Sequence, residues 1–130
     1  MNIRIRSIIQ IVLLVCLTIY AIYAVNFLPS DPGPLCELQD RVPTNELVYV
    51  NHARCRMGCR DINKKLVEKV YQEGTVNCDK SSYKNGHARY ALEKRDKRGD
   101  KIRVIVEDDD GKHLIITVIR LGQEDHCTCS

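Results

Sequence analysis

Tryptophan is absent from this chain, and other aromatic residues are few. The 130 residues include no Trp, one Phe and six Tyr, and Tyr20, Tyr23 and Phe27 lie in an apolar run near the N-terminus. The rest of the chain therefore has four aromatic side chains to build a core and no indole for stacking on nucleic acid bases. A domain with so modest a core benefits from covalent cross-links.

The chain also lacks a strong excess of charge of either sign. It contains 20 Lys and Arg and 17 Asp and Glu, and setting aside Arg4 and Arg6 leaves 18 basic against 17 acidic residues, a net charge of +1. This balance implies no strong field for polyanions, so nucleic acid is not an expected partner. The sequence shows no internal repeat and no low-complexity tract.

A long uncharged run, Ser7 to Leu28, follows the first basic residues. Its 22 residues are long enough to cross about 30 Å of hydrocarbon. Because Arg4 and Arg6 precede the run and Asp31 follows it, the basic flank should stay in the cytoplasm. We expect residues 1–28 to be the single-pass signal anchor of an inner-membrane protein with a periplasmic domain. The alternative is cleavage near Ala24 and secretion.

The remaining chain divides into a tether and one domain. Residues 29–46 form a tether that opens with Pro-Ser-Asp-Pro-Gly-Pro, in which the prolines prevent helix formation. Residues 47–130 are expected to form a small domain. Leu47 to Val50 is a short strand or an extended lead-in, and Asn51 is a candidate N-cap for a first helix. A second helix should begin near Asn63 and end in a left-handed cap at Gly74.

After Gly74 the hydrophobic period changes from helical to alternating, which indicates strands. We expect strands over 89–95, 102–107 and 114–121, joined by the turn 96–100 and the hairpin 109–112. The fold class is therefore α+β, with two short helices packed on one face of a three- or four-stranded antiparallel meander. The expected apolar face contains Tyr90, Leu92, Ile102, Val104, Val106, Leu114, Ile116 and Val118. The other face presents Arg89, Glu93, Arg103, Glu107 and Thr117, and it is either a ligand site or an ordinary solvated face.

Cysteine and histidine residues gather at the two ends of this domain. His52, Cys55 and Cys59 share one face of the first helix, and Cys127 and Cys129 point the same way from an extended tail. One interpretation is a tetrahedral zinc site made by the four cysteines, or by three of them with His52 or His126. His87 and His113 have no recognisable partner and are expected at the surface.

The second interpretation is a disulfide framework, which an oxidising compartment favours. A bridge within Cys127-Thr-Cys129 would be strained, and Cys55 with Cys59 would be at the limit of separation in a helix. Bridges from helix to tail are therefore expected, which leaves Cys36 to pair with Cys78. A redox-active thiol pair is a third alternative, although no Cys-x-x-Cys motif is present.

Residues 51–62, which read Asn-His-Ala-Arg-Cys-Arg-Met-Gly-Cys-Arg-Asp-Ile, precede a helix and three strand segments, 89–93, 102–106 and 116–118. This pattern resembles the bacterial domain of unknown function 4258, in which a His-Ala-x-x-Arg-Met-x-x-Arg-x-Ile motif opens the first helix. The resemblance covers about residues 47–121, and the added cysteines suggest a cysteine-rich branch of that family.

That family has been grouped by analogy with barnase, colicin nucleases and toxin-type ribonucleases, which implies helices before a curved antiparallel sheet. The analogy implies that His52 is a general acid or base, that Arg56, Arg60 and Arg103 bind phosphate, and that Thr117 supports the site. Fold analogy alone does not establish such an activity.

The sequence favours a membrane-anchored envelope protein whose disulfide-linked domain binds a protein or a small ligand without catalysis or a cofactor. One alternative is a toxin-like or degenerate ribonuclease with His52 at its centre. Another is an extracytoplasmic zinc-binding domain.

Overall fold

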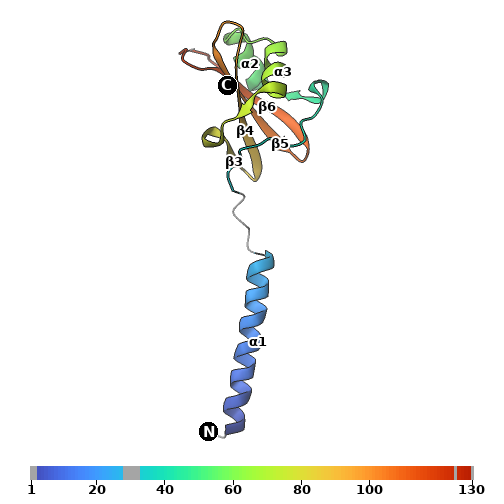
Figure 1. Cartoon of the computed structure of the whole chain (residues 1–130), viewed down its shortest axis with the longest axis vertical. Coiled ribbons are helices and arrows are strands. Elements are labelled where there is room, and N and C mark those ends of the chain that lie inside the picture. The colour runs from blue at the N-terminus through green and yellow to red at the C-terminus, as the bar shows by residue number, and fades with distance from the viewer. Residues whose placement is uncertain (1–2, 28–32, 125, 130) are drawn as a thin grey trace. The chain divides into compact units, whose positions relative to one another are not determined.

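The computed structural model describes residues 3–27, 33–124 and 126–129. It divides the chain into two units, Met1–Gly33 and Pro34–Ser130. In the first unit, helix α1 spans Ile3–Phe27 (Figure 1). Its described apolar side chains are largely exposed. By length and composition this helix is able to cross a membrane, and a signal sequence would meet the same criteria.

The second unit is an α+β domain, as the sequence predicts (Figure 1). Two α-helices and six strands form it, together with short 3-10 turns at Thr44–Glu46 and Cys78–Lys80. In chain order the elements are β1 (Val48–Tyr49), α2 (Asn51–Cys59), α3 (Lys64–Glu73), β2 (Thr75–Val76), β3 (Ser82–Lys84), β4 (His87–Arg95), β5 (Lys101–Asp109) and β6 (Lys112–Arg120).

The six strands form one mixed sheet in the order β1-β6-β5-β4-β2, with β3 also paired to β4. The long central strands are antiparallel, as predicted, but β1 runs parallel to β6. The sheet thus has more strands than predicted. β1 lies within the short strand expected at Leu47 to Val50, whereas β2 and β3 are too short to give an alternating pattern. A turn signal precedes β4, however, since Asn85 and Gly86 both adopt positive φ between β3 and β4.

A β-bulge in β6 changes which of its residues reach the core. Ile105 pairs with Thr117 and Val106 pairs with Ile115, so Ile116 is an extra residue in β6. Ile115 and Val118 are consequently buried, whereas Ile116 is half-buried. The prediction that Leu114 and Ile116 share the apolar face is wrong, because the bulge reverses the alternation. The other core strand residues are Leu92, Ile102, Val104 and Val106.

Helix α3 follows its predicted start but ends differently. The Asn63 side chain accepts a hydrogen bond from the Leu66 N–H at 2.9 Å and so caps the helix at the start that the sequence predicts. Gly74 is extended, with φ −70° and ψ 152°, so the predicted left-handed cap is wrong. Glycine is needed there for space, because a Cβ would clash with the Val70 carbonyl oxygen and lie 3.2 Å from that of Glu93.

Helix α2 begins one residue earlier than predicted. Asn51 is its first residue, and Val50 occupies the N-cap without a side-chain hydrogen bond. The helix packs against β6, and Ala53 is its fully buried residue. Most of its polar side chains therefore lie at the edge of the domain.

A buried polar pair joins α3 to β6. The backbone N–H of Val42 donates to Tyr71 Oη at 2.8 Å, and this oxygen lies 2.5 Å from His113 Nδ1. The His113 tautomer decides whether the phenol or Nδ1 supplies the proton of this second bond. Burial lowers the pKa of His113, against an opposing effect of Asp108. The prediction that His113 is a surface residue without a partner is therefore wrong.

Candidate functional site

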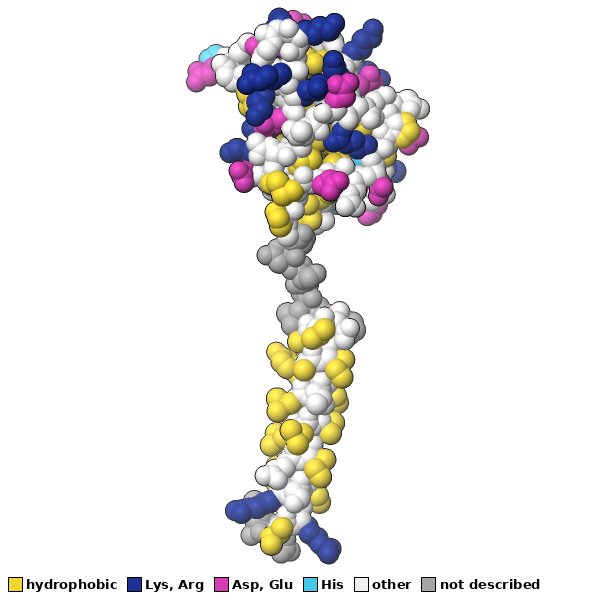
Figure 2. All heavy atoms as spheres, in the orientation of Figure 1, with side chains coloured by type: hydrophobic (Ala, Val, Ile, Leu, Met, Phe, Trp, Pro, Cys, Tyr) yellow, Lys and Arg dark blue, Asp and Glu magenta, His cyan; other side chains and the backbone are white. Residues whose placement is uncertain are grey.

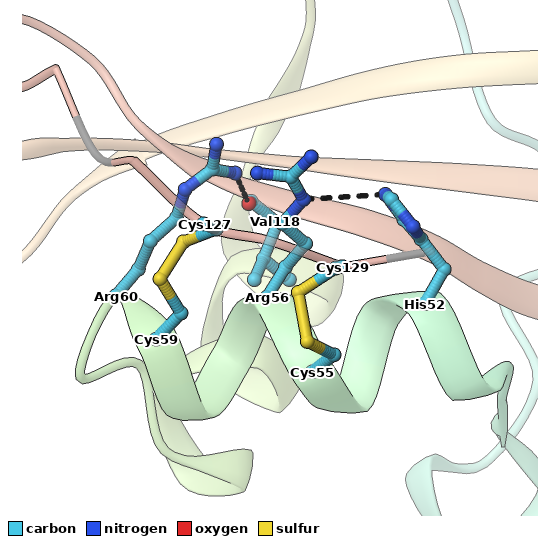
Figure 3. Close-up of a disulfide and its surroundings, with 8 residues drawn as sticks. All are labelled: His52, Cys55, Arg56, Cys59, Arg60, Val118, Cys127 and Cys129. Atoms are coloured by element: carbon cyan, nitrogen blue, oxygen red, sulfur yellow. Dashed lines mark hydrogen bonds between the residues drawn. A yellow bond between two sulfur atoms is a disulfide. The ribbon is translucent and has the colours of Figure 1, made fainter.

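Three disulfides connect segments of the domain that are distant in sequence. Cys55 bonds to Cys129 and Cys59 to Cys127, each with Cα atoms 5.9 Å apart (Figure 3). Cys36 bonds to Cys78 with 4.6 Å between Cα atoms. These are the helix-to-tail bridges and the remaining pair expected from the sequence. Cys16, in α1, is a free and exposed cysteine.

The two bridges from α2 hold the C-terminal tail along the helix. Cys127 joins the end of α2 and Cys129 joins its middle, so the tail runs antiparallel to the helix (Figure 3). The third bridge fastens the segment before β1 to the 3-10 turn between β2 and β3. Irregular segments at both ends of the domain are thus covalently attached to its helix-and-sheet framework.

The same bridges bear on the predicted zinc site. A zinc ion takes thiolate sulfur, and here all four candidate cysteines share their sulfur atoms in disulfides. The described residues include no group of three or more His, Cys, Asp or Glu side chains arranged to hold a metal ion. In this oxidised state the cysteines act as cross-links.

His52, Arg56 and Arg60 leave α2 on the same side, beside the disulfides (Figure 3). Arg56 Nε donates to His52 Nε2 at 3.3 Å, and Arg60 Nη1 donates to the carbonyl oxygen of Val118 in β6. Because an arginine can only donate, Nε2 of His52 is the unprotonated nitrogen and is already occupied. All three of these side chains therefore make hydrogen bonds within the domain.

Arg103 and Thr117 lie on the other face of the sheet. Arg103 alternates with the buried Ile102 and Val104, and Thr117 precedes the buried Val118, so both side chains point away from the helices. Arg103 is bound to Glu93 there. The five predicted catalytic residues thus form two groups, one beside the edge of β6 and one on the face opposite the helices.

The face opposite the helices is neutralised by its own ion pairs. Glu93, 6% exposed, lies 2.5 Å from Lys101 Nζ and 2.6 Å from Arg103 Nη2 and accepts from Asn77 at 3.1 Å. Burial raises the pKa of Glu93, but these hydrogen bonds outweigh it and lower the pKa below its ordinary value. Arg89 and Glu107 form a further pair. This face matches the solvated alternative better than the ligand-site alternative.

Sequence reasoning missed a basic groove of about 510 Å³ between α3 and the β4–β5 turn. Its lining includes six cationic side chains, Lys65, Lys69, Lys94, Arg95, Lys97 and Arg98. The signal was present as a dense run of basic residues from 94 to 98, but the neutral charge of the whole domain concealed it.

A smaller hollow of about 260 Å³ lies on the other side of α2 from its disulfides, lined by Tyr49, Arg54, Met57 and Lys64. Lys64 Nζ lies 5.6 Å from the centre of the Tyr49 ring, a cation–π contact. Burial, with a contribution from Glu68, raises the pKa of Tyr49 to about 12. The phenol is therefore neutral at physiological pH and contributes no charge to this hollow.

Comparison with known proteins gives one match. The family model of the domain of unknown function DUF4258 matches residues 49–120, from β1 to the end of β6, which is more than half of the chain. No curated protein and no solved structure matches significantly. The matched segment contains α2 with His52 and Arg56, and Arg60 directly after the helix, while the tail that carries Cys127 and Cys129 lies beyond it. The chain therefore belongs to the DUF4258 family.

Proposed function

We propose that this protein is a membrane-anchored, extracytoplasmic binding module without catalytic activity. The observation that carries the proposal is the pairing of all six cysteines of the second unit in three disulfides. Such bonds persist in oxidising compartments and are rare in the cytoplasm. Helix α1, which is apolar and long enough to cross a membrane, supports translocation of the domain into such a compartment.

The arrangement of the candidate catalytic residues supports a role without catalysis. A general base needs a ring nitrogen within reach of a substrate proton, and His52 Nε2 is held by Arg56. A phosphate-binding arginine needs free donors, and Arg103 donates to the buried Glu93. A disulfide-linked domain with these constraints suits a rigid scaffold for binding.

The topology is tested by fusing alkaline phosphatase, which is active only after export, to the C-terminus of the full chain. The proposal expects an active fusion that stays in the membrane fraction with the mass of the intact precursor. A soluble fusion that has lost its first residues would instead establish a cleaved signal. An inactive fusion would place the domain in the cytoplasm and overturn the proposal.

The family analogy keeps a ribonuclease as the competing function, and the adjacency of His52 and Arg56 is the observation in its favour. The purified chain, incubated with single-stranded RNA, is expected to leave it intact. RNA cleavage that disappears in His52→Ala but persists in His87→Ala would show a catalytic His52. It would refute the binding-module proposal.

A further inference from the structure

The basic groove concentrates positive charge in one concave place. Lys65 and Lys69 are one helical turn apart on α3, and the other cationic lining residues come from the end of β4 and the turn after it. Figure 2 shows basic side chains gathered over the part of the domain where α3 and the β4–β5 turn lie in Figure 1. The near-neutral composition of the domain therefore conceals a local excess of positive charge.

The acidic side chain that lines the groove pairs with one of these cations, since Asp96 Oδ2 lies 3.8 Å from Arg98 Nε, and its other contacts hold the fold together. Asp96 Oδ1 accepts from the backbone N–H of Arg98 at 2.8 Å and of Asp100 at 3.0 Å, and Oδ2 accepts from Arg120 at 3.0 Å. Arg120 is 3% exposed and also donates to the carbonyl oxygen of Asp61 at 3.2 Å, beyond the end of α2. Asp96 thus serves the fold and shapes the turn.

Several cations of the groove have no partner of opposite charge. Among the described residues, Lys65, Lys69 and Lys97 form no ion pair or hydrogen bond, whereas Lys94 lies 3.2 Å from Glu73. Lysines one turn apart on a helix repel each other, and a bound anion would relieve that repulsion. The groove therefore has charge available for a ligand.

From these contacts we infer that the groove binds a compact ligand bearing two or more phosphate-type charges. A volume of about 510 Å³ is that of a small-molecule site, and Asn63 adds an amide to the cationic lining. None of the lining residues is aromatic, so bases have nothing to stack on and a nucleic acid is disfavoured. The inference rests on the proposed binding role and names its ligand class.

The test measures binding of inorganic tripolyphosphate to the full chain in uncharged detergent micelles by calorimetry. Changing Lys65, Lys69 and Lys97 together to Gln should weaken binding about tenfold or more, because three charges leave the groove. The matched control changes Lys80, Lys84 and Lys112 to Gln, which removes the same charge from exposed positions outside the groove. That control should weaken binding less than about twofold.

A second titration distinguishes two sources of the phosphate. A short-chain cardiolipin, whose headgroup carries two phosphates, is added to the same micelles to test a lipid headgroup, and tripolyphosphate tests a free phosphate compound. The inference is supported if either ligand binds saturably, the groove variant loses that binding and the control variant keeps it. A charge-retaining variant with Arg at positions 65, 69 and 97 should restore binding, which separates lost charge from lost folding.

Three results would overturn the inference. The first is that neither ligand binds saturably. The second is that the groove variant and its control lose the same amount of binding affinity. The third is that a single-stranded oligonucleotide binds more tightly than tripolyphosphate. If neither ligand binds while the phosphatase fusion is active and RNA stays intact, the inferred ligand class is refuted and the proposed function is not. An inactive fusion would instead refute the proposed function itself.

Discussion

Glu93 is the residue whose charge the sheet depends on most. It is buried, and Lys101, Arg103 and Asn77 all bind its carboxylate. Replacing it by Gln removes the charge from these bonds and should lower the free energy of unfolding by about 2 kcal/mol. Urea denaturation at neutral pH measures this change. Glu107→Gln, in the Arg89–Glu107 ion pair of this face, is the comparison variant. Because Glu107 is more exposed, its replacement should lower the free energy of unfolding by less.

The same carboxylate makes stability depend on acid pH. Its pKa is lower in the folded protein than the ordinary value of 4.5, so the folded state binds this proton less readily. The stability from Glu93 is therefore present above that value and is lost as the pH falls below it. The loss of unfolding free energy below pH 4.5 should be smaller in Glu93→Gln. An unchanged pH profile would contradict the assignment.

His113 should make stability depend on pH in a higher range than Glu93 does. Burial lowers its pKa below the ordinary value of 6.5, so protonation favours the unfolded chain. Stability should fall as the pH drops from about 6.5, and His113→Gln should reduce that fall. Urea midpoints at pH 7 and pH 5.5 test this, with His87→Gln as the control because His87 is only partly buried, beside Asp109. The same midpoint difference in both variants would refute the assignment.

Individual side chains illustrate how far the sequence alone could lead. The Asn63 cap and the Asp110-Gly111 turn were predictable because their signals are local. The burial of His113 was not, because it depends on Tyr71 of a helix 42 positions away. The separation of His52 from Arg103 was also hidden, since it depends on which face of the sheet each residue reaches.

At the scale of elements, the cap of α3 gives a matched pair of variants. Asn63→Ala removes the hydrogen bond to Leu66 N and should cost about 1 kcal/mol. Asn51→Ala changes the same residue type at the first position of α2, where no side-chain cap bond exists, and should cost a few tenths at most. Thermal unfolding of both variants measures the difference. Equal losses would show that the cap bond contributes nothing.

The two bridges between α2 and the tail should behave as a coupled pair. With one bridge intact, the other closes only a small ring of residues 55–59 and 127–129, and its removal should cost about 2.5 kcal/mol. Removing both bridges also frees the long loop between Cys59 and Cys127, whose sequence separation is 68, and should lower the free energy of unfolding by about 7 kcal/mol. Double and quadruple Cys→Ser variants in urea test this. A quadruple variant no worse than the sum of the doubles would contradict the coupling.

The elements were predictable in proportion to their length. The three long strands and α3 carry periodic patterns, whereas β2 and β3 are too short to carry one. Helix α2 has little apolar periodicity, and Asn51 is the signal that indicates it. The bulge in β6 was hidden because Leu114, Ile115 and Ile116 are all apolar, so this segment fits either phase of the alternation equally well. Tertiary packing decides the phase there.

At the scale of the whole molecule, the net charge of the domain does not show where its charged side chains gather. Composition indicates a nearly neutral domain without a polyanion partner, yet cations from α3 and the β4–β5 turn meet in one groove. Only the fold brings residues 65 and 69 beside residues 94–98. Composition is therefore a poor guide to the kind of partner when basic residues from separate elements lie together in the fold.

The proposed function depends most on the six cysteines of the domain being cross-links. The most direct measurement is the mass of the full chain purified from membranes, with and without alkylation, followed by peptide mapping and metal analysis. We predict bridges between Cys36 and Cys78, Cys55 and Cys129, and Cys59 and Cys127, with alkylation at Cys16 alone and no bound zinc. Four free thiols in α2 and the tail with one equivalent of zinc would contradict this prediction.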